Sequence, residues 1–251
     1  QKARLGGEGL LTTTKSTGID LVTEVDKKAE KMLVDSIKAY YPDHAVLAEE
    51  SGLTGKDSDY LWIIDPLDGT TNYAQGLPLF TISVALQYKG LTVLGAVCAP
   101  VLDQLFTAIR GQGAYLNNNK IKIASKTELI DSVLATGFPY DIASHEINNV
   151  AYFNRIAPLA RGIRRLGSAA LDAAYTAAGI FDGYWELKLA PWDVAAGILL
   201  VEEAGGETIY FRQDRGVSVI CGNKTICEKI QAEIKAVDAE SGGKTNSVQS
   251  L

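Results

Sequence analysis

The residues from Asp65 to Asn72, which read Asp-Pro-Leu-Asp-Gly-Thr-Thr-Asn, constrain the fold more than any other segment. They follow directly on the apolar run Trp62–Ile64, so two carboxylates emerge at the end of a predicted buried strand, where water is scarce. Pro66 cannot continue a central strand, so we expect the chain to turn there. Along a regular strand Asp65 and Asp68 would face opposite ways, whereas a turn can bring both carboxylates to one point.

The residues that follow this turn are suited to holding an anion. Gly69 lets a ligand approach the backbone closely because it has no side chain. Thr70, Thr71 and Asn72 can cap a following helix turn, which leaves backbone N–H groups directed at an anion. The alternative is an ordinary Asx-Pro turn. The clustering of carboxylates, a glycine and hydroxyls after an apolar strand favours a binding site.

Two further carboxylates could join Asp65 and Asp68. Glu49 ends an earlier strand-like run, and Asp193 lies in the first turn of a helix predicted to begin at Pro191. Close carboxylates repel each other, which raises a pKa unless a cation lies between them. Hard divalent ions such as Mg²⁺ prefer oxygen ligands, so the cluster predicts a metal site. Taken alone, Asp193 is better explained as a charge that complements the helix dipole.

A similar motif in another class of enzymes implies a different chemistry. Phosphatases of the haloacid-dehalogenase type carry Asp-x-Asp-Gly-Thr after a strand, where the period of two aligns both carboxylates and the first is a nucleophile. Here one more residue separates Asp65 from Asp68, which breaks that alignment. A covalent aspartyl-phosphate is therefore the less favoured route.

The periodicity of the remaining chain predicts sheets covered by helices. A helix from Thr23 to Tyr40 begins with a capping motif of Thr23 and Asp26 and ends before Pro42. Its apolar positions are Val25, Ala29, Met32, Leu33, Ile37 and Tyr40. Strands are expected at Ala45–Ala48, Leu61–Ile64, Leu79–Gln87, Leu91–Ala99, Gln104–Ile109, Ser132–Thr136, Glu207–Tyr210 and Val217–Cys221. Further helices are expected at Ser144–Ala160, Ser168–Ala178, Pro191–Ala204 and Ile226–Val237.

This order of elements predicts an α+β region followed by an α/β region. We expect an N-terminal α+β portion over residues 1–140 that carries the acidic motif. A C-terminal α/β portion would cover residues 141–240, and a disordered polar tail would cover residues 241–251.

Composition excludes several function classes. The chain has 24 Lys and Arg against 30 Asp and Glu, a formal charge of −6, which makes binding of a nucleic-acid backbone unfavourable. No apolar run approaches the ~18 residues of a membrane span, and no secretory signal is visible, although the sequence does not begin with Met. Cys98, Cys221 and Cys227 lack metal-ligand spacing and fit buried thiols in a reducing cytoplasm.

Several segments together resemble the signatures of the inositol monophosphatase family. Its two main motifs are matched by Asp65–Asn72 and Pro191–Gly197, and its glutamate and N-terminal elements by Ala48–Ser51 and Leu21–Asp26. The similarity runs in order from about Lys15 to Val237, and Arg165–Asp172 resembles the bacterial branch. The resemblance implies a layered αβαβα sandwich of the inositol monophosphatase and fructose-1,6-bisphosphatase type.

The family resemblance also implies hydrolysis of a small phosphate monoester by metal-activated water, with two or three Mg²⁺ ions per site. By position, the metal ligands would be Glu49, Asp65, the carbonyl of Leu67, Asp68 and Asp193. Residues that orient the attacking water would be Thr70 and Glu49. The phosphate would be held by the backbone N–H groups of Gly69 and Thr70. The alcohol would be contacted by Asp68, Ala169, Glu186 and Asp193. Asp26 would lie just outside the metal site, and Lys15 on a mobile loop beside it.

The substrate and any partner are left open by the sequence. Inositol monophosphate leads, with fructose 1,6-bisphosphate, a nucleotide 3′-phosphate or histidinol phosphate as alternatives. A bacterial relative is an extragenic suppressor that acts partly through the RNA and transcription machinery, so binding to that machinery is an alternative of a different class. The family also implies a homodimer and inhibition by Li⁺.

Two local features bear on the alcohol portion of the substrate. Arg164 and Arg165 could bind a second anionic group, or they could form surface salt bridges. Glu186 could accept hydrogen bonds from ring hydroxyls, or it could be a surface residue flanking Lys188.

Overall fold

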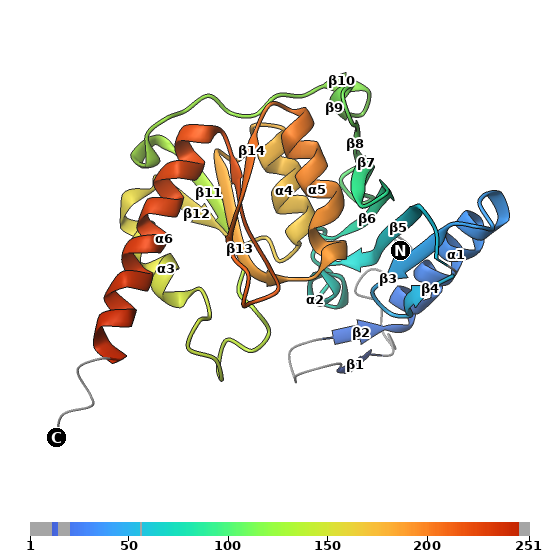
Figure 1. Ribbon diagram of the computed structural model, residues 1–251, viewed down its shortest axis with the longest axis horizontal. Helices are drawn as coiled ribbons and strands as arrows, with labels where there is room; N and C mark the ends of the chain where they lie inside the picture. The colour runs from blue at the N-terminus through green and yellow to red at the C-terminus, as the bar shows by residue number, and fades with distance from the viewer. Residues whose placement is uncertain (1–11, 15–20, 56, 246–251) are drawn as a thin grey trace.

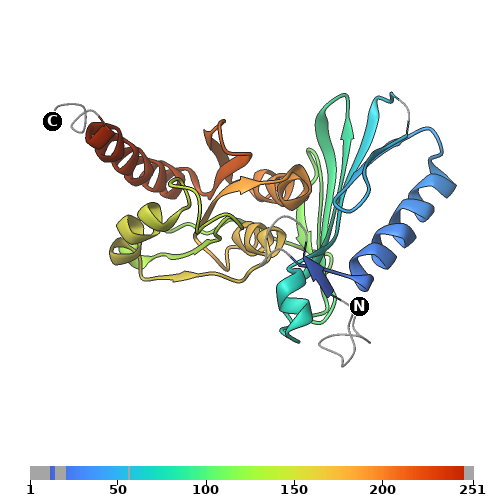
Figure 2. The same ribbon diagram turned by 90° about the horizontal axis from the view of Figure 1, so that it is seen from below.

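In the described part of the chain, two large β-sheets alternate with three layers of helices (Figures 1 and 2). The computed structural model describes residues 12–14, 21–55 and 57–245. The outer layer on one side is helix α1 (Glu24–Tyr40), followed by an eight-stranded sheet and the helices α4 (Ala169–Ala177) and α5 (Pro191–Glu203). A five-stranded sheet comes next, covered by α3 (Val150–Ile156) and α6 (Lys224–Thr245). The predicted αβαβα sandwich is confirmed.

The eight-stranded sheet has the order β10-β9-β8-β7-β6-β5-β3-β4 and is antiparallel except where β3 pairs with β5. Its strands are β3 (Ala45–Ala48), β4 (Gly52–Thr54), β5 (Tyr60–Asp68), β6 (Thr81–Tyr88), β7 (Leu91–Ala99), β8 (Gln104–Ile109), β9 (Gly113–Leu116) and β10 (Asn119–Lys120). The expected antiparallel hairpins in this region are confirmed. A separate ribbon consists of β1 (Thr12–Thr14) and β2 (Leu21–Thr23).

The five-stranded sheet has the order β12-β11-β13-β15-β14. Its strands are β11 (Val133–Thr136), β12 (Gly162–Arg164), β13 (Gly183–Leu189), β14 (Glu207–Arg212) and β15 (Val217–Gly222). β11 is parallel to both of its neighbours, and the remaining pairs are antiparallel. β11 thus belongs to the second sheet although it precedes residue 140, the expected boundary between the two portions. Helices α4 and α5 contact both sheets. A division of the chain at residue 140 stays a prediction.

Helix α1 begins with the predicted capping box. The Thr23 hydroxyl accepts the N–H of Val25, and the Asp26 carboxylate accepts the N–H of Thr23. The inner face packs on the first sheet through Leu33, Val34 and Ile37. The side chains of Met32 and Tyr40, which the periodicity placed on this face, are 64% and 79% exposed. The apolar stripe is therefore narrower than predicted, because the helix contacts only one sheet surface.

Small residues let α4 and α5 pack closely between the two sheets. A Cβ atom at Gly197 would lie 2.6 Å from the Cβ of Ala173, and one at Gly95 would lie 2.9 Å from the carbonyl oxygen of Ala196. Helix α5 is therefore in van der Waals contact with both α4 and β7. This packing fixes the positions of the N-terminal ends of α4 and α5.

Two predicted elements have different bounds in the structure, and the predicted turn at Pro66 is replaced by a continued strand. Strand β5 continues through Pro66 to Asp68, with an irregular pairing register between Asp65 and Asp68. A proline is tolerated there because such an irregularity interrupts the hydrogen-bond ladder. The helix predicted over Ser144–Ala160 begins only at Val150, after Asn149 in the left-handed conformation, and continues as a 3₁₀ turn over Ala157–Leu159. A second 3₁₀ turn covers Leu129–Asp131.

The C-terminal helix is longer than its periodicity predicts. α6 ends at Thr245, whereas the polar tail was expected to begin at residue 241, and residues 246–251 lie outside the described part of the chain.

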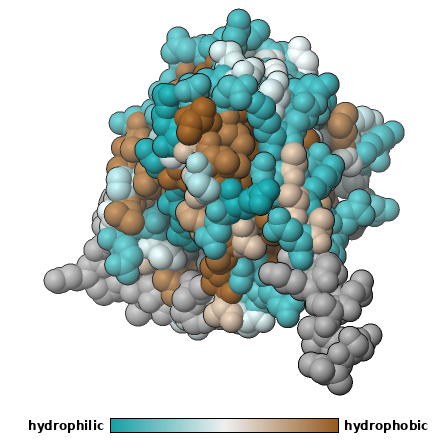
Figure 3. Space-filling view, turned by 90° about the vertical axis from the view of Figure 1, so that its left-hand side faces the viewer, coloured by the Kyte–Doolittle hydropathy of each residue, from teal (hydrophilic) through white to brown (hydrophobic). Residues whose placement is uncertain are grey.

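The face seen from the α3 and α6 side shows apolar patches separated by hydrophilic residues (Figure 3). None of the helices in the described ranges is long and apolar enough to span a membrane.

Candidate active site

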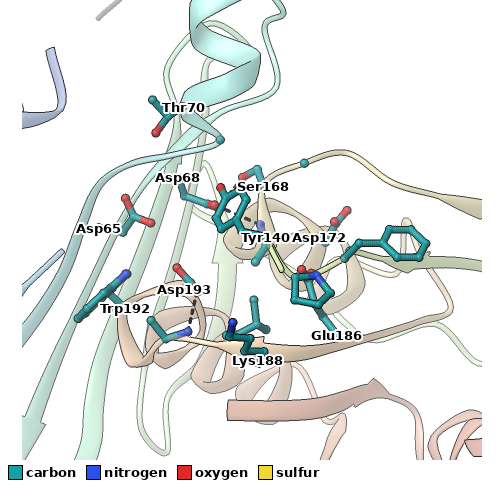
Figure 4. A pocket seen from close by; sticks show the side chains of 18 of the residues that line it. Asp65, Asp68, Thr70, Tyr140, Ser168, Asp172, Glu186, Lys188, Trp192 and Asp193 are labelled. Carbon is teal, nitrogen blue, oxygen red and sulfur yellow. Dashed lines mark hydrogen bonds between the residues drawn. The ribbon is translucent and has the colours of Figure 1, made fainter. Parts of the chain in front are cut away.

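A cavity of about 430 Å³ opens where the end of β5 meets the N-terminal ends of α4 and α5 (Figure 4). The part of the chain before Lys120 contributes Glu49, Asp65 and residues 67–70 to its lining. The part after Val133 contributes residues 137–140, Arg165, residues 167–169, Asp172, residues 186–190, Trp192 and Asp193. The predicted metal and substrate residues therefore lie in one cavity. Asp26 lies behind it, and Lys15 is outside the described residues.

Asp65 and Asp68 lie at the irregular end of β5 in different surroundings. One oxygen of Asp65 accepts the N–H of Leu67 at 2.9 Å. Asp68 accepts the Ser168 hydroxyl at 2.6 Å and the N–H of Ala170 at 2.8 Å, so the N-terminal end of α4 stabilises its charge. Burial raises the pKa of Asp68, although these hydrogen bonds oppose the rise.

The electrostatic surroundings of Asp65 are unfavourable for an anion. Burial raises the pKa of its carboxyl well above the ordinary value, and the charges of Glu49, Asp68 and Asp193 raise it further. Among the residues that the structure describes, the main influences on the pKa of Asp65 are burial and these carboxylates, and no cation is among them. Four carboxylates so close together therefore leave negative charge that an external cation can balance.

Glu49 and Asp193 approach this cluster from separate elements. The N–H of Glu49 donates to the carbonyl of Ile64 at 3.2 Å, and the N–H of Glu50 donates to the buried Glu30 of α1 at 2.8 Å. Asp193 accepts the N–H of Ala190 at 2.7 Å, so it also caps α5, as the helix-dipole interpretation predicts. Burial and the charge of Asp68 raise its pKa well above the ordinary value, which shows that it also belongs to the cluster.

Thr70 is fixed by the fully buried Asp26. Its hydroxyl lies 2.9 Å from Oδ1 of Asp26 and 3.1 Å from the carbonyl oxygen of Leu67. Helix α2 (Thr70–Ala74) begins at this residue, so Thr70 to Asn72 lie within the helix instead of capping it. The cap is Gly69, whose φ of 95° favours glycine and whose added Cβ would lie 3.0 Å from the carbonyl oxygen of Leu79.

Glu186 lies at the other end of the cavity and is not a surface residue. Its side chain is buried and accepts the hydroxyl of Tyr184 at 2.8 Å. Burial raises the pKa of Glu186 to about 7. A Cβ atom at Gly137 would overlap the Glu186 carboxylate, so the glycine makes room for it. Ala169 lies in the first turn of α4 and also lines the cavity.

Some residues of the site were not recognised from the sequence. Ser168 was predicted only as the cap of α4, and it also donates to Asp68. Asp172 is buried at the cavity wall, and its Oδ1 accepts no hydrogen bond from the described residues. Gly137 directly follows the strand that ends at Thr136, and this strand–glycine junction is the signal that could have marked it. Of the arginine pair, only Arg165 lines the cavity.

The donor set suits a hard divalent cation. The carboxylates of Glu49, Asp65, Asp68 and Asp193 and the carbonyl of Leu67 provide only oxygen atoms, which Mg²⁺ and Ca²⁺ prefer. As the side chains stand, no three His, Cys, Asp or Glu residues in the described ranges are placed to hold one ion together. The residues therefore fit such ions by chemistry and by clustering, and closing around an ion requires side-chain movement.

This combination of fold and acidic cavity agrees with a family comparison. The model of the inositol monophosphatase family matches residues 3–239. The chain therefore belongs to the inositol monophosphatase family, a family of phosphatases.

Curated relatives carry two kinds of name. A protein of Pasteurella multocida named "Nus factor SuhB" is 48% identical over 200 residues, which cover 79% of this chain and 74% of that protein. An "Inositol-1-monophosphatase" of Mesorhizobium japonicum is 40% identical over 234 residues, which cover 91% of this chain and 87% of that protein.

Solved structures share the fold. An IMPase of Thermotoga maritima superimposes with a TM-score of 0.85 at 35% identity, over 95% of this chain and 92% of that one. A structure described as an IMPase/NADP phosphatase complexed with NADP and Ca²⁺ gives a TM-score of 0.77 at 27% identity, over 90% of this chain and 86% of that one.

Proposed function

We propose that this chain is a Mg²⁺-dependent phosphomonoesterase that hydrolyses inositol monophosphate to inositol and phosphate. The observation that carries the proposal is the buried Asp65, whose pKa is raised by burial and by three neighbouring carboxylates. A negative cavity of this kind can accept a phosphate ester only when cations reverse its charge. The family membership and the named relative from Mesorhizobium japonicum support the choice of substrate.

Two ions would share the acidic end of the cavity, with a third, weaker ion beside them. The first would be held by Glu49, Asp65 and the carbonyl of Leu67. The second would be held by Asp65, Asp68 and Asp193, and Glu49 would also face the third. When bound, such ions neutralise phosphate charge, lower the pKa of a bound water and stabilise the leaving oxygen.

The side chains of the protein orient the reactants. Thr70 donates a hydrogen bond to Asp26, so it could relay a proton: its oxygen would accept one from the attacking water as its own hydroxyl proton passes to the Asp26 carboxylate. Glu49 would orient the same water. The N–H groups of Gly69 and Thr70 at the start of α2 would hold phosphate oxygens, and Ala169, Glu186, Asp68 and Asp193 would contact the alcohol.

The test measures phosphate release from inositol 1-phosphate with Mg²⁺ and with a chelator. We expect activity only with Mg²⁺, and we expect Asp65→Asn to remove it while circular dichroism stays native. Asp35→Asn is the matched control, because Asp35 is an exposed carboxylate paired with Lys31 on α1. Full turnover by Asp65→Asn in metal-free buffer would contradict the proposal. Parallel assays with fructose 1,6-bisphosphate, a nucleotide 3′-phosphate and histidinol phosphate test the alternative substrates.

A second candidate function is binding to the transcription or RNA machinery. It is supported by the "Nus factor SuhB" name of the relative that is 48% identical. The excess of acidic residues favours a protein partner over RNA itself. Capture of transcription-elongation proteins from lysate by both wild type and Asp65→Asn would show that binding is independent of catalysis.

Three further properties complete the proposal. We expect a homodimer, for which light scattering at micromolar concentration should give twice the 26.9 kDa chain mass. We expect Li⁺ to inhibit in the presence of Mg²⁺, which a Li⁺ titration measures. The three free thiols, two of them buried, are compatible with a reducing cytoplasm.

A further inference from the structure

A group of three charged residues beside the cavity has no role in the proposed chemistry. Arg215 donates to both carboxylate oxygens of Asp141 at 2.9 and 3.0 Å, and Lys188 Nζ donates to one of them at 2.6 Å. One carboxylate thus faces two cations, so the group carries a net positive charge. Arg215 alone, bound in bidentate geometry, is enough to balance Asp141.

The two cations differ in their freedom to move. The Arg215 side chain is 8% exposed and also donates to the carbonyl of Ile147 at 3.0 Å, so it is held in place behind Lys188 and does not itself line the cavity. The Lys188 side chain is 40% exposed, and the residue lines the cavity next to Leu187 and Leu189. A lysine ammonium on its flexible four-carbon stem can change partners. Lys188 can therefore leave Asp141 without leaving that carboxylate unpaired.

The backbone places Lys188 at the cavity by an uncommon conformation. Its φ is 62°, in the left-handed region, where the pairing of β13 with β15 is irregular between Glu186 and Leu189. A side chain other than glycine is held there only when its surroundings determine the conformation, and such residues cluster at functional sites. Lys188 lies on the same strand, β13, as Glu186, which is proposed to contact the alcohol (Figure 4), so we call this part of the cavity the alcohol end.

We propose that Lys188 is a specificity-determining residue whose ammonium binds a second anionic group on the alcohol portion of the phosphate ester. The inference rests on the proposed phosphomonoesterase function and adds a substrate class, namely phosphate monoesters that also carry a second phosphate or a carboxylate. On binding, Lys188 exchanges Asp141 for this group, and Arg215 keeps Asp141 balanced.

The test compares kcat/KM for three esters. Fructose 1,6-bisphosphate carries a second phosphate, 3-phosphoglycerate carries a carboxylate, and glycerol 2-phosphate carries neither. We expect Lys188→Met to lower kcat/KM about tenfold, relative to glycerol 2-phosphate, for one or both of the esters that carry a second anionic group. This is the effect of one charge-assisted hydrogen bond. The ester that responds identifies the anionic group, and Lys188→Arg should keep most of the preference.

Lys89 offers a closely matched control. It is also left-handed, with φ of 49°, and it also pairs with an aspartate, Asp59, at 3.6 Å. It lies in the turn between β6 and β7 and does not line the cavity. Lys89→Met should therefore leave the ratios of kcat/KM unchanged.

The outcomes separate this inference from the proposed function. Unchanged ratios of kcat/KM for the three esters in an active Lys188→Met enzyme would overturn the inference. It would also be overturned if Arg165→Gln lost the preference for esters with a second anionic group while Lys188→Met kept it. If wild type with Mg²⁺ hydrolyses neither these esters nor inositol 1-phosphate, the proposed function fails. Calorimetric binding of the same three esters to wild type and Lys188→Met still tests the inference, with equal affinities contradicting it.

Discussion

The two ends of the cavity keep a buried carboxylate by different means. At the acidic end, Asp65 is surrounded by the charges of Glu49, Asp68 and Asp193, all of which raise its pKa. At the alcohol end, Glu186 accepts the hydroxyl of Tyr184, and the charge of Arg165 partly offsets the effect of burial on its pKa. In our proposal a bound cation balances Asp65, whereas Glu186, with a pKa of about 7, can retain its own proton near neutral pH.

The largest effect should follow from removing a charge at the acidic end. Asp65→Asn should lower kcat/KM for every phosphate ester by a similar factor, about 10²–10³. This is the range seen when a group that stabilises charge in the transition state is removed. The same change relieves repulsion, so thermal unfolding of the metal-free protein should occur at an equal or higher temperature. Equal activity, or a clear loss of metal-free stability, would contradict the account of this cluster.

A smaller but still general loss is expected at Thr70. Thr70→Ala removes the hydroxyl that donates to Asp26, so turnover should fall about 10²-fold, typical of a lost proton-transfer group. Thr70→Ser keeps the hydroxyl and should retain most activity. Steady-state rates with inositol 1-phosphate measure both, and a serine variant as inactive as the alanine variant would assign Thr70 a packing role only.

The alcohol end should affect discrimination more than turnover. Above pH 7, where Glu186 is mainly ionised, Glu186→Gln should reduce the preference for inositol 1-phosphate over p-nitrophenyl phosphate about tenfold, since hydrogen bonds to a charged acceptor contribute about 1.5–3 kcal/mol. Competitive assays with both esters measure the ratio. Equal losses on the two substrates, or none on either, would remove Glu186 from a role in specificity.

The smallest effect concerns pH and stability. The pKa of Glu186 is about 7 in the folded chain against an ordinary 4.5, so between these values the folded state binds more protons than the unfolded state. The free energy of unfolding of the metal-free protein should therefore fall as pH rises through this window, by at most about 1.4 kcal/mol per unit from Glu186. Urea unfolding of wild type and Glu186→Gln between pH 5 and 7 checks this, because the variant should show a shallower slope.

The sequence predicted which residues line the cavity better than it predicted their local geometry. The strand before Asp65, the capping box of α1 and the ends of α4 and α5 follow from apolar periodicity and capping residues, which act over a few positions. The irregular end of β5 and the left-handed Asn149 could not be predicted in this way. Asn149 is held by Trp185 and by the carbonyl of Gly137, which are distant in the sequence, so its conformation depends on tertiary contacts.

The role of Ser168 shows the same limit. A serine before a helix predicts a cap, and the structure confirms that it accepts the N–H of Leu171. Its second contact, with Asp68, joins residues 100 positions apart and leaves no periodic signal in the sequence. Lys188 is similar, because its neighbours Asp141 and Arg215 come from other elements.

The bonds between Asp68 and the start of α4 also determine when the site can form during folding. They join Asp68 to Ser168 and Ala170 across 100 and 102 residues, so the chain must close a long loop before either bond exists. Contacts of such high sequence separation form slowly, after local hairpins such as β6–β7. In a refolding experiment the recovery of phosphate release should therefore lag behind the recovery of the far-ultraviolet circular dichroism signal.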